Sequence, residues 1–121
     1  MNFTKMAGLA LAAALLAPGA AGAADAPAAF TACKACHKVE AGKNGIGPSL
    51  FAVFGRKAGT AEGFALYSDA LKASGTVWDD EKLTAWITNP KAVIPTTKMM
   101  FPGIKKPEDV KAVVDYLKTL K

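Results

Sequence analysis

The residues most able to do chemistry lie in one short run, Cys33-Lys34-Ala35-Cys36-His37. This run contains both cysteines and the single histidine of the 121-residue chain. The spacing C-x-x-C-H is typical of the site at which a c-type haem is attached. Each thiol can form a thioether with one vinyl group of the haem, and the adjacent imidazole can then bind the iron. We therefore predict one covalently bound haem c, with His37 as an axial ligand.

Three other interpretations of the same residues are weaker but stay open on the sequence alone. A structural zinc site needs four nitrogen or sulfur ligands, and the two cysteines and one histidine supply only three. A thioredoxin-like dithiol pairs C-x-x-C with a βαβ pattern, and no such strand pattern lies nearby. The two cysteines could also form a plain disulfide beside an incidental His37. Haem attachment is the interpretation that uses all three side chains together, and it is the one we favour.

The first residues have the order of a secretory signal peptide. Lys5 precedes a short apolar run rich in alanine and leucine, and an A-x-A cleavage signal ends at Ala23. The run is shorter than the about 20 apolar residues that cross a bilayer. We therefore predict a signal peptide over residues 1–23, with cleavage after Ala24 and an uncleaved anchor as the two alternatives.

The predicted mature domain, residues 24–121, is small, basic and exported to the periplasm. The whole chain has a formal net charge of +5, and the signal peptide removes only Lys5 from that balance. A domain of this size has a marginal core, which a large flat cofactor would enlarge. Its basic residues form no long run and no nucleic-acid motif, so we expect no nucleic-acid partner. We expect instead a monomer that meets acidic protein surfaces and does not insert into the membrane once the signal is cleaved.

The remaining sequence predicts an all-α fold of short helices joined by long loops. A helix is expected to begin at Asp25 and Pro27 and to carry the C-x-x-C-H run, followed by a glycine-rich loop over residues 42–59. A short helix is expected over 68–73, and a clearer one follows the acidic residues 79–81 and stops at Asn89-Pro90. The last helix is expected from residue 107, with an apolar stripe at helical spacing. That stripe consists of Val110, Val113, Val114, Leu117 and Leu120, with Tyr116 beside it.

Two adjacent methionines are candidates for the second axial position of a haem iron. Met99 and Met100 are the only methionines after the predicted signal peptide, and they lie in a loop bounded by proline and glycine, residues 94–103. A loop can place a thioether over a haem face. Both side chains could instead fill gaps in the core.

A series of short motifs follows the C-x-x-C-H run in a recognisable order. They are Gly47-Pro48-x-Leu50, Phe54-Gly55-Arg56-Lys57, Tyr67-Ser68-x-Ala70, Asn89-Pro90-Lys91 and Thr97-Lys98-Met99-x-Phe101-x-Gly103. The order resembles the class I c-type cytochromes over nearly the whole mature chain, above all the branch of mitochondrial cytochrome c and the bacterial cytochromes c2. The resemblance implies short helices and loops wrapped around one haem. It also implies crossed N- and C-terminal helices, here with Phe30 against Tyr116.

The resemblance also implies roles for individual residues. In this family the methionine of T-K-M-x-F is the sixth iron ligand, which implies Met99 and leaves Met100 as a core residue. The Pro48 carbonyl would accept the Nδ1 proton of His37. The remaining residues implied to surround the haem are Arg56, Tyr67, Trp78 and Ser68 at the propionates, and Thr97 near the Met99 sulfur.

Three positions depart from the family pattern. Trp86 stands where a tyrosine usually bonds the methionine sulfur, and Leu71 stands where an asparagine is usual. Both changes should make that side of the haem drier and alter its redox tuning. Ala26 replaces a glycine of the helix crossing, and the N-terminal helix is also shorter.

The implied ligand pair predicts a function. With His37 and Met99 both bound, the iron has no open position for a substrate, so the resemblance implies a soluble periplasmic one-electron carrier and not an enzyme. The partners it implies are a quinol–cytochrome c oxidoreductase as donor and a terminal oxidase or photosynthetic reaction centre as acceptor. The docking residues it implies are Lys91, Lys98, Lys105 and Lys106. The alternative is a peroxidase-like enzyme or gas sensor in which Met99 leaves the iron.

Overall fold

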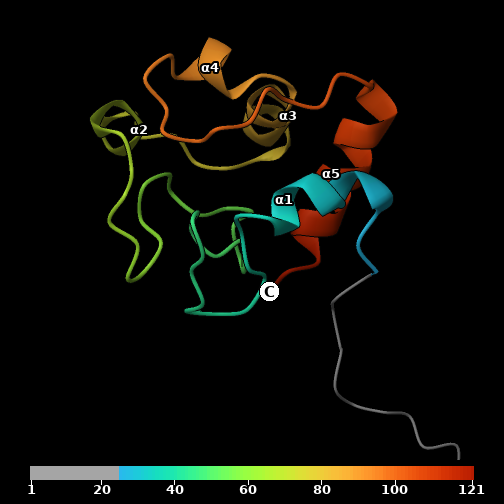
Figure 1. Ribbon diagram of the computed structural model, residues 1–121, viewed down its shortest axis with the longest axis horizontal. Helices are drawn as coiled ribbons and strands as arrows, with labels where there is room; N and C mark the ends of the chain where they lie inside the picture. Colours follow the sequence, from blue (N-terminus) through green and yellow to red (C-terminus); the bar gives the residue numbers. More distant parts are fainter. Residues whose placement is uncertain (1–24) are drawn as a thin grey trace, which may run out of the picture.

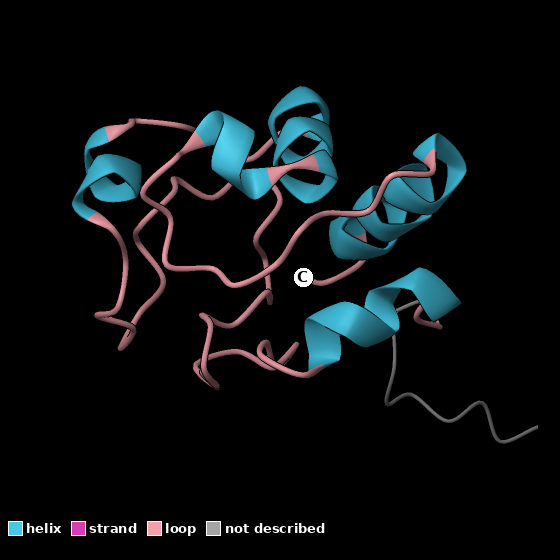
Figure 2. Ribbon diagram, turned by 45° about the horizontal axis from the view of Figure 1, so that its top comes forward, coloured by secondary structure: helices cyan, strands magenta, loops and turns pink. Residues whose placement is uncertain are grey.

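The computed structural model describes residues 25–121, so the predicted signal peptide lies outside the described residues. A 3₁₀ helix and five α-helices are connected by loops (Figures 1 and 2). The described part of the chain has no strand, only an isolated bridge between Lys57 and Val77. The predicted all-α class is therefore confirmed. The helices are η2 (Ala28–Phe30), α1 (Thr31–Lys34), α2 (Asp69–Ala73), α3 (Asp80–Thr88), α4 (Pro90–Val93) and α5 (Pro107–Lys118).

The first helical segment begins later than predicted. Asp25 lies outside it, and η2 starts after Pro27 without a side-chain cap. An aspartate that caps a helix from position 25 would use the N–H of residue 27 or 28, and Pro27 removes one of these two partners because it has no N–H. The segment ends in a turn in which the N–H groups of Cys36 and His37 both donate to the Cys33 carbonyl. This turn places the two cysteines and the histidine within reach of one ligand.

The segment after Asn89 forms a short helix, α4, which was not predicted from the sequence. Asp79 caps α3 by accepting a hydrogen bond from the Lys82 N–H at 2.8 Å, as its acidic start predicted. Asn89 ends α3, and its side chain accepts from the Ala92 N–H at the start of α4. Pro90 then occupies the first turn of α4, where its missing N–H costs nothing. The Asn-Pro pair is therefore both the end of one helix and the start of the next.

The N- and C-terminal helices pack against each other, as predicted. Phe30 is fully buried, and its ring meets that of Tyr116 edge-on, with 4.7 Å between centroids. Figures 1 and 2 show the η2–α1 segment next to α5, and η2 is the part of it that contacts α5. The whole predicted stripe of α5 is buried. α5 also packs against α3, so this last helix contacts helices from both the start and the middle of the described chain.

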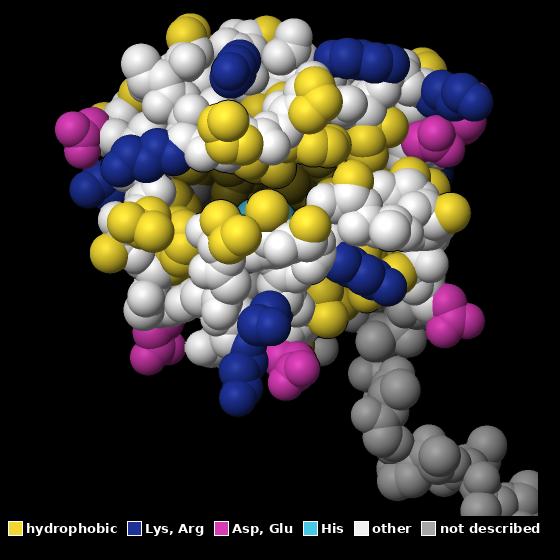
Figure 3. Space-filling model, viewed as in Figure 1, with side chains coloured by type: hydrophobic (Ala, Val, Ile, Leu, Met, Phe, Trp, Pro, Cys, Tyr) yellow, Lys and Arg dark blue, Asp and Glu magenta, His cyan; other side chains and the backbone are white. Residues whose placement is uncertain are grey.

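The loop-rich half of the molecule forms the wall opposite these helices. Residues 38–68 contain no helix, and they lead to α2, whose N-terminus is capped by the buried Ser68. The Ser68 hydroxyl accepts from the Leu71 N–H at 3.2 Å. The loops and the helices enclose a central hollow between them (Figure 3).

Candidate haem-binding site

A cavity of about 350 Å³ lies between the helices and the loops. Its volume falls in the range of small-molecule binding pockets, and its walls are mainly apolar. Figure 3 shows hydrophobic side chains around its mouth and the single histidine within it. The lining comes from α1, the loops that follow it, α2, α3, the methionine loop and α5. A site built from so many segments suits a large ligand held inside the fold.

His37 is held in one tautomer at the cavity wall. Its Nδ1 lies 2.7 Å from the Pro48 carbonyl oxygen, which is the predicted hydrogen bond. A carbonyl can only accept, so Nδ1 carries the proton and Nε2 keeps its lone pair. Burial lowers the pKa of His37, the Pro48 bond opposes that shift, and the positive charge of Arg56 adds to it. A neutral imidazole with a free Nε2 is the form that binds a metal.

Two glycines let the loop approach the C-x-x-C-H turn closely. A Cβ at Gly47 would lie 2.5 Å from Cε1 of His37, and a Cβ at Gly45 would lie 2.6 Å from the Cys36 carbonyl oxygen. The Gly47 N–H also donates to that Cys36 oxygen at 2.8 Å. Any larger residue at position 47 would displace the imidazole ring. The sequence indicated these glycines only as loop residues.

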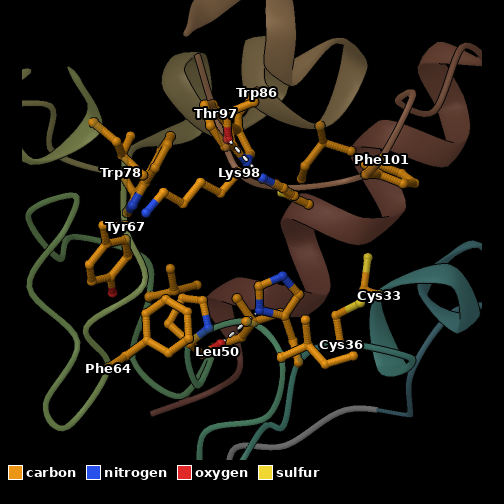
Figure 4. Close-up of a pocket in the computed structure, with 18 of the residues that line it drawn as sticks. Cys33, Cys36, Leu50, Phe64, Tyr67, Trp78, Trp86, Thr97, Lys98 and Phe101 are labelled. Carbon is orange, nitrogen blue, oxygen red and sulfur yellow. Dashed lines mark hydrogen bonds between the residues drawn. The ribbon is translucent and has the colours of Figure 1, made fainter. Parts of the chain in front are cut away.

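Both cysteines line the cavity, half-buried and not joined in a disulfide. Figure 4 shows Cys33 and Cys36 together at one side of the cavity, beside α1. Burial raises the pKa of the Cys33 thiol, and the nearby Cys36 adds to this. Within residues 25–121, no cluster of three or more His, Cys, Asp or Glu side chains could hold a metal ion. The two thiols and the imidazole thus lie together at the wall of one cavity, as haem attachment requires.

Of the two methionines, only Met99 turns inward. It is half-buried, lines the cavity and packs against the core, and its N–H donates to Oγ1 of Thr97 at 3.2 Å. Met100 is 90% exposed at the cavity rim, so the prediction of a core residue was wrong. The Phe101 N–H donates to the Met99 carbonyl at 3.1 Å, so the chain turns at Met100, whose side chain lies on the outside of this turn.

Arg56 keeps spare donors close to the cavity. Its guanidinium donates to the carbonyl oxygens of Ser49 at 2.9 Å and Phe51 at 3.2 Å. These two bonds fix the orientation of the side chain, and burial lowers its pKa. Arginine carries five N–H donors, so three of them stay available to an anionic group.

Tyr67 and Trp78 lie at the end of the cavity away from the cysteines (Figure 4). The Tyr67 hydroxyl accepts from the Ala61 N–H at 3.0 Å, and its own proton has no acceptor among residues 25–121. The indole N–H of Trp78 likewise donates to no group in the described chain. Ser68, the α2 cap, is buried in the same wall. This end of the cavity therefore offers hydrogen-bond donors to acidic groups of a ligand.

The departures at Leu71 and Trp86 form part of an apolar wall. Both side chains are buried and line the cavity. The Trp86 ring meets that of Trp78 edge-on, with 5.4 Å between centroids. This wall has the apolar character that the sequence predicted.

The predicted docking lysines lie in different surroundings. Lys98 lines the cavity, and its side chain crosses the mouth toward Trp78 (Figure 4). Lys91 is exposed on α4, and Lys106 is exposed directly before α5. The Lys105 amine, in contrast, donates to the carbonyl oxygens of Thr88 and Pro102.

Exposed apolar residues on the cavity lining were not predicted. They are Ile46, Leu66 and Met100, with 74%, 63% and 90% of their surfaces exposed. All three lie in loops, where hydrophobic periodicity gives no signal. They surround the opening with apolar surface.

Comparison with known proteins places this site in a family. The family model for cytochrome c matches residues 23–121. The chain is 63% identical over 98 residues to cytochrome c2 iso-2 of Magnetospirillum molischianum, across 81% of this chain and all of the relative. It is 55% identical to cytochrome c2 of Rhodoplanes tepidamans, across 80% and 99% of the two chains. The solved structure of cytochrome cH from Methylobacterium extorquens superposes with a TM-score of 0.69 at 52% identity, across 75% of this chain and 91% of the other.

The chain belongs to the cytochrome c family, and within it resembles the cytochromes c2. Membership confirms the predicted covalent haem c, and the Cys33 and Cys36 pair fits its attachment. Proteins of this family are electron carriers and not enzymes, which sets the peroxidase or sensor alternative aside. None of the helices in residues 25–121 is long and apolar enough to span a membrane.

Proposed function

We propose that this chain is a periplasmic one-electron carrier whose haem iron is bound by His37 and Met99. The observation that carries the proposal is that both side chains line one cavity although 62 residues separate them in the sequence. The free Nε2 of His37 and the inward Met99 thioether supply the two donors. The predicted signal peptide supports the periplasmic location.

The surrounding residues favour the reduced form of the iron. Haem c supplies a ferric/ferrous couple when it is bound. A thioether such as that of Met99 stabilises ferrous iron, and a poorly hydrated wall disfavours the extra positive charge of the ferric form. Leu71 and Trp86 provide such a wall. The hydrogen bond from His37 to Pro48 partly opposes this preference for ferrous iron, because it makes the imidazole a better electron donor to ferric iron.

The donors at the far end of the cavity suit the haem propionates. Arg56, Tyr67 and Trp78 each keep at least one N–H or O–H without a protein acceptor in the described chain. Ser68 lies in the same wall. Thr97 is placed next to Met99 by the bond between its Oγ1 and the Met99 N–H. We assign these residues to the haem environment.

A redox titration followed by absorption spectroscopy tests this function. We expect one reversible one-electron transition, with the weak red absorption of methionine-bound haem in the ferric state. Neither redox state should bind carbon monoxide or peroxide rapidly, since both axial positions are filled. Rapid binding of either molecule by the untreated protein would contradict the proposed ligand pair.

For partners, we propose a quinol–cytochrome c oxidoreductase as donor and a terminal oxidase or photosynthetic reaction centre as acceptor. The two relatives named above are both cytochromes c2, which supports redox partners of this kind. Acidic surfaces on these partners would meet the lysines near the cavity mouth. Lys98 lies at the mouth itself, with Lys91, Lys105 and Lys106 in the neighbouring segments.

Reversing the charge at Lys98 should slow association with an acidic partner. We expect Lys98→Glu to lower the rate constant of electron transfer about tenfold at low ionic strength, because it reverses electrostatic steering. The difference should shrink as salt screens the charges. Stopped-flow kinetics against salt concentration measures this. Lys121→Glu at the C-terminus is the matched control, and an equal effect of the two variants would contradict docking at the cavity mouth.

A further inference from the structure

The methionine loop is attached to the C-terminal end of α3 by three consecutive residues. The Ile104 N–H donates to the Ile87 carbonyl at 2.8 Å, and the Lys105 amine donates to the Thr88 carbonyl, also at 2.8 Å. Gly103 packs so closely against the Thr88 carbonyl oxygen that a Cβ at this position would clash with it. These carbonyls belong to the last turn of α3, which has no partners within the helix.

The Lys105 side chain bonds to both sides of this attachment, the end of α3 and the methionine loop itself. Its amine also donates to the Pro102 carbonyl at 3.0 Å, so one ammonium group joins the helix end to the loop residue directly before Gly103. A cation at a helix C-terminus is favoured by the helix dipole. Hydrogen bonds from a charged donor are stronger than neutral ones. Lys105 therefore occupies the place of a C-terminal cap for α3, although it comes from another part of the chain.

The helix that Lys105 caps also forms the cavity wall. Leu83, Trp86 and Ile87 of α3 line the cavity, and Ile87 is the residue whose carbonyl holds the loop. Met99 lies three residues before Pro102 in the same loop. The distance between the Met99 thioether and the opposite wall thus depends on how firmly the loop is held to α3.

We propose that Lys105 is a positioning residue that holds Met99 over the haem iron by clamping its loop to α3. The proposal rests on Met99 as the sixth ligand. It assigns Lys105 a role other than the docking role that its charge and sequence position implied. Lys106, its neighbour, is also exposed, and its side chain has no hydrogen bond or ion pair in the described structure.

Imidazole binding to the ferric holoprotein tests the clamp. Imidazole competes with Met99 for the sixth position, so its affinity reports how firmly the loop is closed. We expect Lys105→Met to bind imidazole about three- to tenfold more tightly than the parent protein. Lys106→Met removes the same charge one residue away and should leave the affinity unchanged. Lys105→Arg keeps a charged donor and should restore most of the parent value.

Amide hydrogen exchange provides a readout that does not depend on the iron. The Ile104 N–H should exchange about three- to tenfold faster in Lys105→Met than in Lys106→Met, because its partner on Ile87 is part of the clamp. Equal imidazole affinity and equal exchange in the two variants would overturn the proposal. Loss of the red absorption band in the parent itself would instead overturn Met99 ligation, and exchange at Ile104 would still decide whether Lys105 holds the loop.

Discussion

Replacing Met99 with alanine removes the weak red absorption of the ferric protein and opens the sixth position to small ligands. The reason is that Met99 is the methionine whose side chain packs inward against the core, whereas Met100 is exposed, and alanine has no donor atom to offer. The reduction potential should fall by an amount on the order of hundreds of millivolts, since the axial ligand is the strongest determinant of haem potential. Absorption spectroscopy, carbon monoxide binding and a redox titration measure these three effects.

Met100→Ala is the matched control for this experiment. Its side chain is almost fully exposed, so the substitution should leave the red band and the reduction potential close to their parent values. A band that survives Met99→Ala, or that disappears in Met100→Ala, would show that the ligand has been assigned to the wrong residue.

Replacing Phe30 with alanine should give the largest loss of stability. The side chain is fully buried between α5 and the cavity, and it makes the edge-on contact with Tyr116. Removing a buried phenylalanine typically costs about 3–5 kcal/mol, because a cavity remains where the ring was. Small domains are stable by only about 5–15 kcal/mol in total. Guanidinium unfolding of the holoprotein, followed by far-ultraviolet circular dichroism, measures this loss.

Phe54→Ala controls for the loss of an aromatic ring as such. Phe54 is partly exposed and contacts the Lys118 ammonium group, so we expect a cost of about 1–2 kcal/mol. If Phe30→Ala destabilised the protein no more than Phe54→Ala, the packing of η2 on α5 would not be a principal source of stability.

The parts of the fold that could be predicted were those whose signals are local. The stripe of α5 and the acidic start of α3 depend on residues within one or two turns, and both helices form as predicted. The C-x-x-C-H run is equally local. The resemblance to the family added Pro48, whose bond to His37 crosses a loop that no periodicity describes.

The parts that escaped prediction depend on contacts between distant segments. Nothing near Lys105 in the sequence indicates that its amine bonds to Thr88, 17 residues before it. The outward direction of Met100 appears only once the turn between Met99 and Phe101 is formed. The close approach of Gly47 to His37 likewise appears only when the loop is folded back. In each case the sequence shows the residue type, but it does not show which distant residue that side chain or backbone contacts.

The hydrogen bond of His37 and the placement of Met99 imply an order of disassembly. His37 and Pro48 are 11 residues apart, whereas His37 and Met99 are 62 residues apart. Closing the longer segment costs about 1.5 kcal/mol more chain entropy than closing the shorter one. The His37 side of the site is thus held by a short loop with a small entropy cost. The Met99 side depends on contacts between residues far apart in the chain. When the protein begins to unfold, the methionine side should open first, with the haem still attached to the segment that carries His37.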